Sequence, residues 1–94
     1  KEDSFILCFK IAETGEAQGR LEFALKYYLK AAETVGRDNR FAVNALLRAA
    51  RIYEDLDRLE EAEGMYKQVA RMGIKESAYA KERLLSIRKA ANKK

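Results

Sequence analysis

The chain has 94 residues, 48% hydrophobic and 36% charged, which suits one domain with a modest core and is too apolar for a disordered chain. It contains neither proline nor histidine, and strong helix formers (Ala, Leu, Glu, Lys and Arg) dominate, which predicts an all-α fold. Nineteen basic and fifteen acidic residues give a net charge of +4. The two signs are interspersed, as on solvated helix surfaces, so the charge gives little reason to expect a nucleic-acid partner.

The same composition argues against an enzyme. Without histidine, the chain lacks the commonest general base and metal ligand. Cys8 lies in an apolar stretch, where a thiol is inert, and we interpret it as a buried structural residue. The sequence has no glycine-rich phosphate loop and no metal-ligand spacing. We therefore expect no catalytic residue, cofactor or metal.

The apolar runs are short, and none approaches the ~20 residues that span a bilayer. No signal peptide is visible, and we expect no direct membrane insertion. Because the chain begins at Lys1 rather than at Met, we expect it to be a fragment of a longer protein. Residues 77–87 loosely resemble the closing helix of some bacterial envelope repeat proteins. The compartment is open between the cytoplasm and the soluble part of such an envelope protein.

Apolar periodicity predicts five helices, near residues 3–17, 20–35, 39–55, 58–72 and 75–91. Apolar or small residues recur one turn apart in the first, third and fifth helices, at Cys8, Ile11, Ala12 and Gly15, at Leu46, Ala49, Ala50 and Tyr53, and at Leu84, Ile87 and Ala91. Gly19 precedes the second helix, and Gly36 stops it. Asp38 or Asn39 supplies an N-cap for the third helix, and Gly73 ends the fourth.

The sequence repeats itself at an offset of 38 residues. Identical residues at this offset are Arg20/Arg58, Leu21/Leu59, Glu22/Glu60, Ala24/Ala62, Tyr28/Tyr66 and Ala32/Ala70. The offset also aligns residues 41–47 with 79–85, and 6–9 with 44–47. The unit is a helix, a turn and a helix; it occurs twice and is followed by one further helix. We expect the recurring alanines where antiparallel helices approach closely, with the two tyrosines filling the space beside them.

The pattern resembles the tetratricopeptide repeat family over nearly the whole chain. The residues that carry the resemblance are Leu46, Ala49, Ala50, Tyr53, Asp57, Ala62, Tyr66 and Val69 in the second unit, and Cys8, Ile11, Ala12, Gly15, Gly19, Ala24, Tyr28 and Ala31 in the first. The resemblance implies a short right-handed α-solenoid forming one domain over residues 1–94, with repeats at about 3–36 and 39–73 and a capping helix at about 75–91. Three departures are the period of 38 rather than the usual 34, the missing proline, and Gly15 where an aromatic is expected.

The resemblance also implies a concave groove lined by the first helix of each unit. Its expected rows are Phe9, Leu47 and Leu85, then Lys10, Arg48 and Ser86, then Glu13, Arg51 and Lys89, then Glu16, Glu54 and Asn92, with Asn44 nearby. An apolar strip edged mainly by basic residues suits a peptide with apolar anchors and acidic groups, although Leu47 and Leu85 could instead be core residues. In one subfamily, Lys and Asn at defined groove positions bind the C-terminal tail of chaperones. Here those positions hold Phe9, Glu13, Arg48, Glu82 and Ser86, so binding of chaperone tails is not expected.

The two ends of the chain differ. The last helix has Lys81, Glu82, Arg83 and Arg88 where the middle unit has Val43, Asn44, Ala45 and Ala50, as expected of a solvated cap. The first helix instead carries five consecutive apolar residues, 5–9, which point in all directions around its axis. They are covered by upstream repeats, by a second copy of the chain, or by the domain's own core and groove.

Three functions follow from these features. The first is a scaffold or adaptor that binds a peptide or partner protein through the concave face. The second is self-assembly through the first helix, with Phe5, Ile6 and Phe9 in the contact. The third and weakest is nucleic-acid binding through basic residues, including the run at 88–94.

Overall fold

The computed structural model describes residues 2–92, and within this range the chain is entirely helical apart from short turns. The elements are α1 (Glu2–Ala17), α2 (Leu21–Val35), η1 (Arg40–Ala42), α3 (Val43–Asp55), α4 (Leu59–Ala70) and α5 (Ser77–Asn92). The all-α class and the five expected α-helices are confirmed for this part of the chain. Lys93 and Lys94, which end the basic run, lie outside the described residues.

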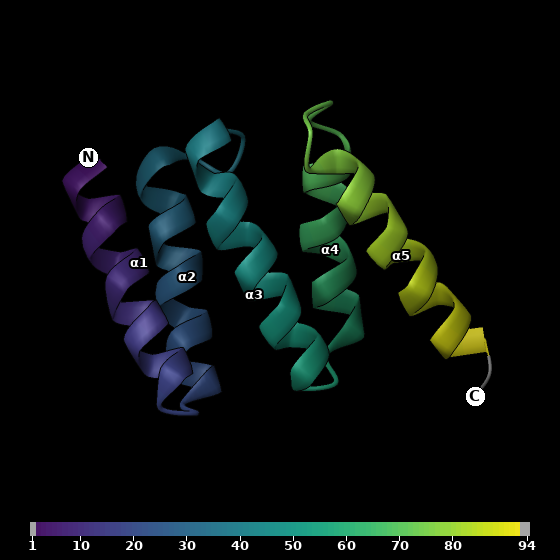
Figure 1. Ribbon diagram of the computed structural model, residues 1–94, viewed down its shortest axis with the longest axis horizontal. Coiled ribbons are helices and arrows are strands. Elements are labelled where there is room, and N and C mark those ends of the chain that lie inside the picture. Colours follow the sequence, from purple (N-terminus) through teal and green to yellow (C-terminus); the bar gives the residue numbers. More distant parts are fainter. Residues whose placement is uncertain (1, 93–94) are drawn as a thin grey trace.

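The helices stand side by side in chain order, each packed on the next (Figure 1). The resulting slab measures 42 × 31 × 16 Å and is only about two helices thick, the shape of a short α-solenoid. None of the described helices is both long and apolar enough to cross a membrane.

Small residues at repeated positions allow the helices to pack closely. Ala12 and Ala24 between α1 and α2, and Ala50 and Ala62 between α3 and α4, are completely buried. Tyr28 and Tyr66, also completely buried, are the largest side chains of the core, as expected from their recurrence at the repeat offset. Cys8 is buried and forms no disulfide, as expected for a structural residue of the core.

The turn inside each helical pair has the same backbone geometry. Gly19 has φ 76° and its equivalent Asp57 has φ 60°. The amide of Arg20 donates to the carbonyl of Gly15 at 2.8 Å, and the amide of Arg58 donates to the carbonyl of Tyr53 at 2.8 Å. Both turns therefore end their first helix in a Schellman arrangement with a left-handed residue, which in the second turn is a strained aspartate.

The aromatic missing at Gly15 is supplied from the facing helix. Gly15 is buried, and a Cβ atom added there would lie 2.6 Å from Cδ2 of Phe23. In the second unit the arrangement is reversed, with Tyr53 at the glycine position and Glu61 at the phenylalanine position. An equivalent arginine covers the aromatic ring in both units: Arg20 lies 4.3 Å from the centre of Phe23, and Arg58 lies 5.0 Å from that of Tyr53.

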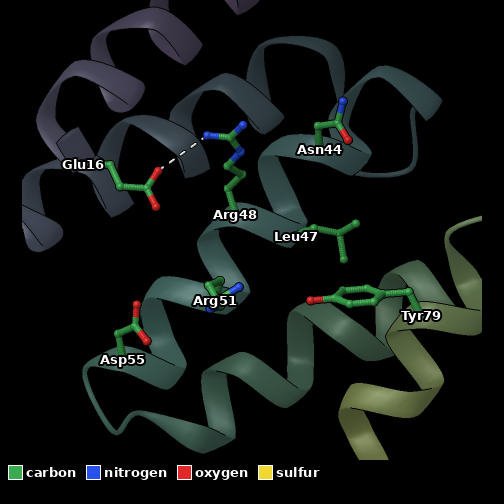
Figure 2. Close-up of a pocket in the computed structure, with 7 residues that line it drawn as sticks. All are labelled: Glu16, Asn44, Leu47, Arg48, Arg51, Asp55 and Tyr79. Atoms are coloured by element: carbon green, nitrogen blue, oxygen red, sulfur yellow. Dashed lines mark ion pairs between the residues drawn. The ribbon is translucent and has the colours of Figure 1, made fainter.

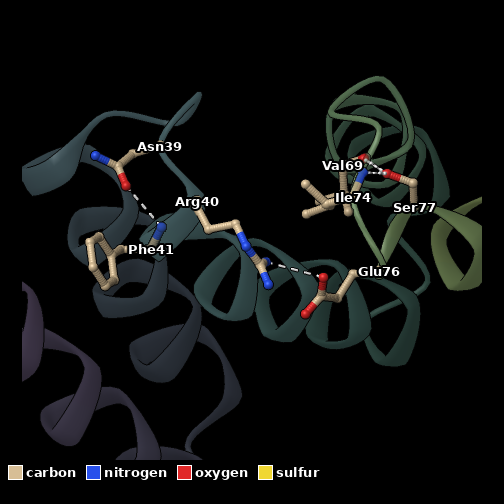
Figure 3. A network of polar contacts seen from close by, with 7 residues as sticks. All are labelled: Asn39, Arg40, Phe41, Val69, Ile74, Glu76 and Ser77. Atoms are coloured by element: carbon tan, nitrogen blue, oxygen red, sulfur yellow. Dashed lines mark hydrogen bonds and ion pairs between the residues drawn. The ribbon is translucent and has the colours of Figure 1, made fainter.

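The loops before α3 and α5 explain why two helices begin later than expected (Figure 3). The side chain of Asn39 caps the chain by accepting from the amide of Phe41 at 2.9 Å, but the first turn that follows is the 3₁₀ helix η1. The buried hydroxyl of Ser77 donates to the carbonyl of Val69 at 2.7 Å and accepts from the amide of Ile74 at 3.1 Å, so α5 starts at Ser77 rather than at 75. Arg40 and Glu76, 3.1 Å apart, join the two loops.

The apolar start of α1 is partly covered by the domain itself. Phe5 and Phe9 stack with ring centres 5.7 Å apart, and Phe9 meets the edge of Tyr28 at 5.2 Å. Ile6 and Leu7 remain 53% and 62% exposed. The helix therefore buries one side and leaves apolar side chains on the rest of its surface.

Candidate functional site

A hollow of about 480 Å³ opens between α3 and α5 (Figure 2). Its lining residues are Glu16, Asn44, Leu47, Arg48, Arg51, Asp55 and Tyr79. Five of them were expected along the groove from the repeat register, whereas Asp55 and Tyr79 were not. Their signals were present in the sequence: Asp55 lies one turn after Arg51, and Tyr79 is the repeat equivalent of Phe41.

The apolar part of this hollow is formed by Leu47 and Tyr79, whose side chains point toward one another (Figure 2). Leu47 is half-buried and packs against the core with part of its surface. Tyr79 is 44% exposed, and its ring makes an edge-to-face contact with Tyr66, with ring centres 6.3 Å apart. Leu85, the next residue of the expected row, is 58% exposed on α5. Leu47 is thus both a packing residue and an accessible surface, which combines the two readings left open by the sequence.

Arg48 is held in place by residues of α1 and α2. It donates a hydrogen bond to the Tyr28 hydroxyl at 3.1 Å and lies 3.6 Å from both Glu13 and Glu16. The Tyr28 hydroxyl donates to Glu16 at 2.7 Å; burial and this carboxylate together raise the pKa of Tyr28 to about 12. The Arg48 guanidinium also lies 5.4 Å from the ring centre of Phe9. Much of its charge is therefore balanced inside the domain.

A second network of the same kind joins α3, α4 and α5. The Tyr66 hydroxyl donates to Glu54 at 2.5 Å, and Arg83 donates to the same carboxylate. Burial, followed by the hydrogen bond to Glu54, raises the pKa of Tyr66. The glutamates and tyrosines of the two networks are equivalent at 38 residues, but the arginines are not, since Ser86 is the equivalent of Arg48. The repeat offset could therefore find only two members of each network.

The uncompensated positive charge of this surface lies on α3 and α5. Arg51 and its repeat equivalent Lys89 are both exposed, and neither forms an ion pair with another described residue. Their α1 equivalent is Glu13, which forms an ion pair with Arg48. Arg51 therefore places a positive charge in the hollow that Leu47, Tyr79 and Asp55 also line, and Lys89 lies one turn after Leu85 on α5.

The remaining expected site residue, Lys10, is exposed on α1 beside a different hollow of about 350 Å³. That hollow is lined also by Ile11, Thr14, Gly15, Gln18, Arg20 and Phe23. The structure therefore separates Lys10 from the residues around Leu47.

Comparison with known proteins gives one match. The family model described as a tetratricopeptide repeat matches residues 6–75, which include all of α2, α3 and α4. No curated protein and no solved structure shows a significant match to the chain.

Proposed function

The chain belongs to the tetratricopeptide repeat family, whose members are generally protein-interaction modules, and from this premise we propose that it binds a peptide segment of a partner protein in the hollow between α3 and α5. The observation that carries the proposal is an accessible apolar pair, Leu47 and Tyr79, beside the guanidinium of Arg51, which forms no ion pair within the described part of the chain. An apolar anchor next to a charged hydrogen-bond donor is the combination that peptide-binding grooves use for affinity and orientation.

The roles of the residues follow from their surroundings. Leu47 and Leu85 contact apolar side chains of the partner, while Arg51 and Lys89 orient acidic groups. Asn44, at the start of α3, offers an amide to the peptide backbone. Glu16 and Arg48 line the hollow on the α1 side. Arg48, which is also paired with Glu13 and lies over Phe9, contributes to binding mainly by holding that side in place. The proposal involves no reaction; residues 1–94 act as one binding domain.

The proposal is tested with Leu47→Ala and a matched control. The control is Leu59→Ala, which truncates another half-buried leucine but lies outside the hollow. The probe is a fluorescent peptide selected from a displayed random library on the unchanged chain. Leu47→Ala should weaken the peptide about tenfold or more, whereas Leu59→Ala should leave its affinity unchanged.

Thermal unfolding of the same two variants separates binding from folding. Both should lose a similar, modest amount of stability, because each leucine is only partly buried. If Leu47→Ala lowers the melting temperature far more than Leu59→Ala, or if both bind the peptide equally, Leu47 is a core residue and the proposed site is wrong.

Self-association is a second candidate, favoured by the exposure of Ile6 and Leu7 on α1. Phe5 and Ile6 would form this contact, whereas the ring of Phe9 already packs against Tyr28 and the guanidinium of Arg48. Light scattering over a hundredfold concentration range tests it. A complex that Phe5→Lys converts to a monomer supports self-association; a monomer at every concentration removes the candidate.

Nucleic-acid binding receives less support, because the arginines are largely engaged. Ion pairs to glutamates occupy Arg37, Arg40, Arg48, Arg58, Arg83 and Arg88. The described cations outside these pairs are distributed over all five α-helices, from Lys10 on α1 to Lys89 on α5, so they do not form one continuous run along the chain for a phosphate backbone.

A further inference from the structure

An apolar hollow of about 220 Å³ lies where the start of α1, the end of α2 and the helix η1 meet. It is lined by Phe5, Ile6, Val35 and Phe41. Phe41 is 61% exposed although it is a large aromatic residue, and Figure 3 shows its ring projecting from η1 beside the cap made by Asn39. No charged side chain lines this hollow.

The repeat offset relates this hollow to the one described above. Ile6 is equivalent to Asn44, and Phe41 is equivalent to Tyr79. Asn44 and Tyr79 line the hollow between α3 and α5, so the apolar hollow occupies the corresponding place one unit earlier, between α1 and η1. The shape recurs but the chemistry changes, because the polar amide of one unit is replaced by an aliphatic side chain in the other.

The charges change along the same direction. On α1 the position of Arg51 is taken by Glu13, and that acid is paired with Arg48 at 3.6 Å. In the first half of the surface the described charges, Glu13, Glu16 and Arg48, are therefore paired with one another. In the second half Arg51 and Lys89 form no ion pair with a described residue, although Asp55 lines the same hollow as Arg51.

We propose that the two hollows are successive parts of one groove and that its occupant is a single peptide segment with an ordered composition. A bulky apolar side chain of the peptide enters the hollow at Ile6 and Phe41, and an acidic side chain lies against Arg51 in the next hollow. This inference rests on the proposed function and adds to it the chemical class and the direction of the ligand.

The size of the apolar hollow favours a peptide side chain over a second copy of the chain. Its volume is below the ~300–1,000 Å³ of pockets for whole small molecules. Ile6 and Phe41 expose 53% and 61% of their surface. For side chains of this size that is on the order of 200 Å² in total, whereas a stable dimer buries about 800 Å² on each partner. One apolar side chain covers such an area completely.

The structure offers a closely matched pair of variants for the test. Ile6→Asn installs the residue that the second unit has at this position, and Leu7→Asn makes the same change at an equally exposed apolar neighbour that lines neither hollow. Binding of the library-selected peptide is titrated against both variants and against Arg51→Gln. We expect Ile6→Asn to weaken the peptide roughly ten- to a hundredfold and Leu7→Asn to leave it unchanged. A peptide analogue in which Glu is replaced by Gln should bind the unchanged chain more weakly than the peptide itself. In the Arg51→Gln variant the two peptides should bind with equal affinity.

The direction of the peptide is measured separately with a spin label on either end. A label at the apolar end should broaden the backbone amide signal of Phe41, and a label at the acidic end should broaden that of Lys89. Equal broadening from both labels would overturn the ordered arrangement.

The remaining outcomes distinguish the two proposals. If Leu47→Ala weakens the peptide but Ile6→Asn does not, the hollow between α3 and α5 stands alone and the extended groove is wrong. If no library peptide binds the unchanged chain, both proposals fail. If Ile6→Asn lowers the solution mass of the protein, a second copy occupies the apolar hollow, and the peptide assignment is overturned.

Discussion

Replacing Gly15 by alanine should destabilise the domain, although alanine is the better helix former. Gly15 lies within α1, where glycine costs about 0.5–1 kcal/mol relative to alanine. The added Cβ would stand 2.6 Å from Cδ2 and 3.1 Å from Cε2 of Phe23. Phe23 must therefore turn away from its position under Arg20, and a clash of this kind typically costs about 1–3 kcal/mol. The net effect of Gly15→Ala is a loss of roughly 0–2.5 kcal/mol.

The steric explanation is isolated by a double-mutant cycle with Phe23→Ala. Once the phenylalanine ring is removed, Gly15→Ala should stabilise the domain by the full helical gain of about 0.5–1 kcal/mol. The difference between the two backgrounds gives a coupling of roughly 1–3 kcal/mol. Urea unfolding of the four proteins, followed by far-ultraviolet circular dichroism, measures it.

Gly64→Ala is the control for the cycle. Gly64 also lies within a helix, but a Cβ atom added there would have no neighbour within 4 Å. This substitution should stabilise the domain by about 0.5–1 kcal/mol with or without Phe23. Effects at Gly15 and Phe23 that add within about 0.5 kcal/mol would refute the contact between them.

Three further predictions concern the turns and the buried networks. Asp57→Gly should raise the free energy of unfolding by about 0.5–1 kcal/mol, because φ 60° strains an aspartate but not a glycine; a lower urea midpoint would contradict this explanation. Tyr28 keeps its proton more tightly in the folded state, with a pKa of about 12 against 10.0 for an ordinary tyrosine. The stability that it contributes is therefore complete below pH ~10 and is lost toward pH ~12 at roughly 1.4 kcal/mol per pH unit. The free energy of unfolding of Tyr28→Phe, measured over the same pH range, should fall with a smaller slope. Ser77→Ala should cost about 1–3 kcal/mol in thermal unfolding, since it leaves the Val69 carbonyl and the Ile74 amide without their buried partner; a change below about 0.5 kcal/mol would show that water replaces the hydroxyl.

The helices and their packing were predictable because the forces that specify them are local or repeated. Alanines at 12, 24, 50 and 62 mark close helix contacts, and the tyrosines at 28 and 66 mark the space beside them. The residue types after Gly36 indicated a cap at Asp38 or Asn39; the structure selects Asn39, which caps η1 rather than α3. Helix starts were less predictable: the two hydrogen bonds of Ser77 set the beginning of α5, and they depend on where the end of α4 lies in space.

The candidate site was only partly predictable because several of its determinants join separate helices. The repeat register placed Leu47, Arg48 and Arg51 along one surface, and the structure brings them to one hollow. It could not show that Arg48 is balanced by Glu13 and Glu16, since that depends on the distance between α1 and α3. The sequence also could not show that the ring of Phe23 fills the space of the aromatic expected at position 15. Phe23 reaches that space from the facing helix α2, so this too depends on how the helices pack.

The two units differ where packing does not require them to agree. Several equivalent buried positions carry the same residue, such as Tyr28 and Tyr66, because both must fill the same space; Gly15 and Tyr53 differ because Phe23 occupies the space beside the glycine. The exposed positions Ile6 and Asn44 carry different chemistry although their backbones are equivalent. A scaffold that only needed solubility would be expected to place polar residues at both. The proposed ligand, apolar at one end and acidic at the other, accounts for the exposed apolar side chains of Ile6 and Phe41 beside a second hollow in which Arg51 has no ion-pair partner among the described residues.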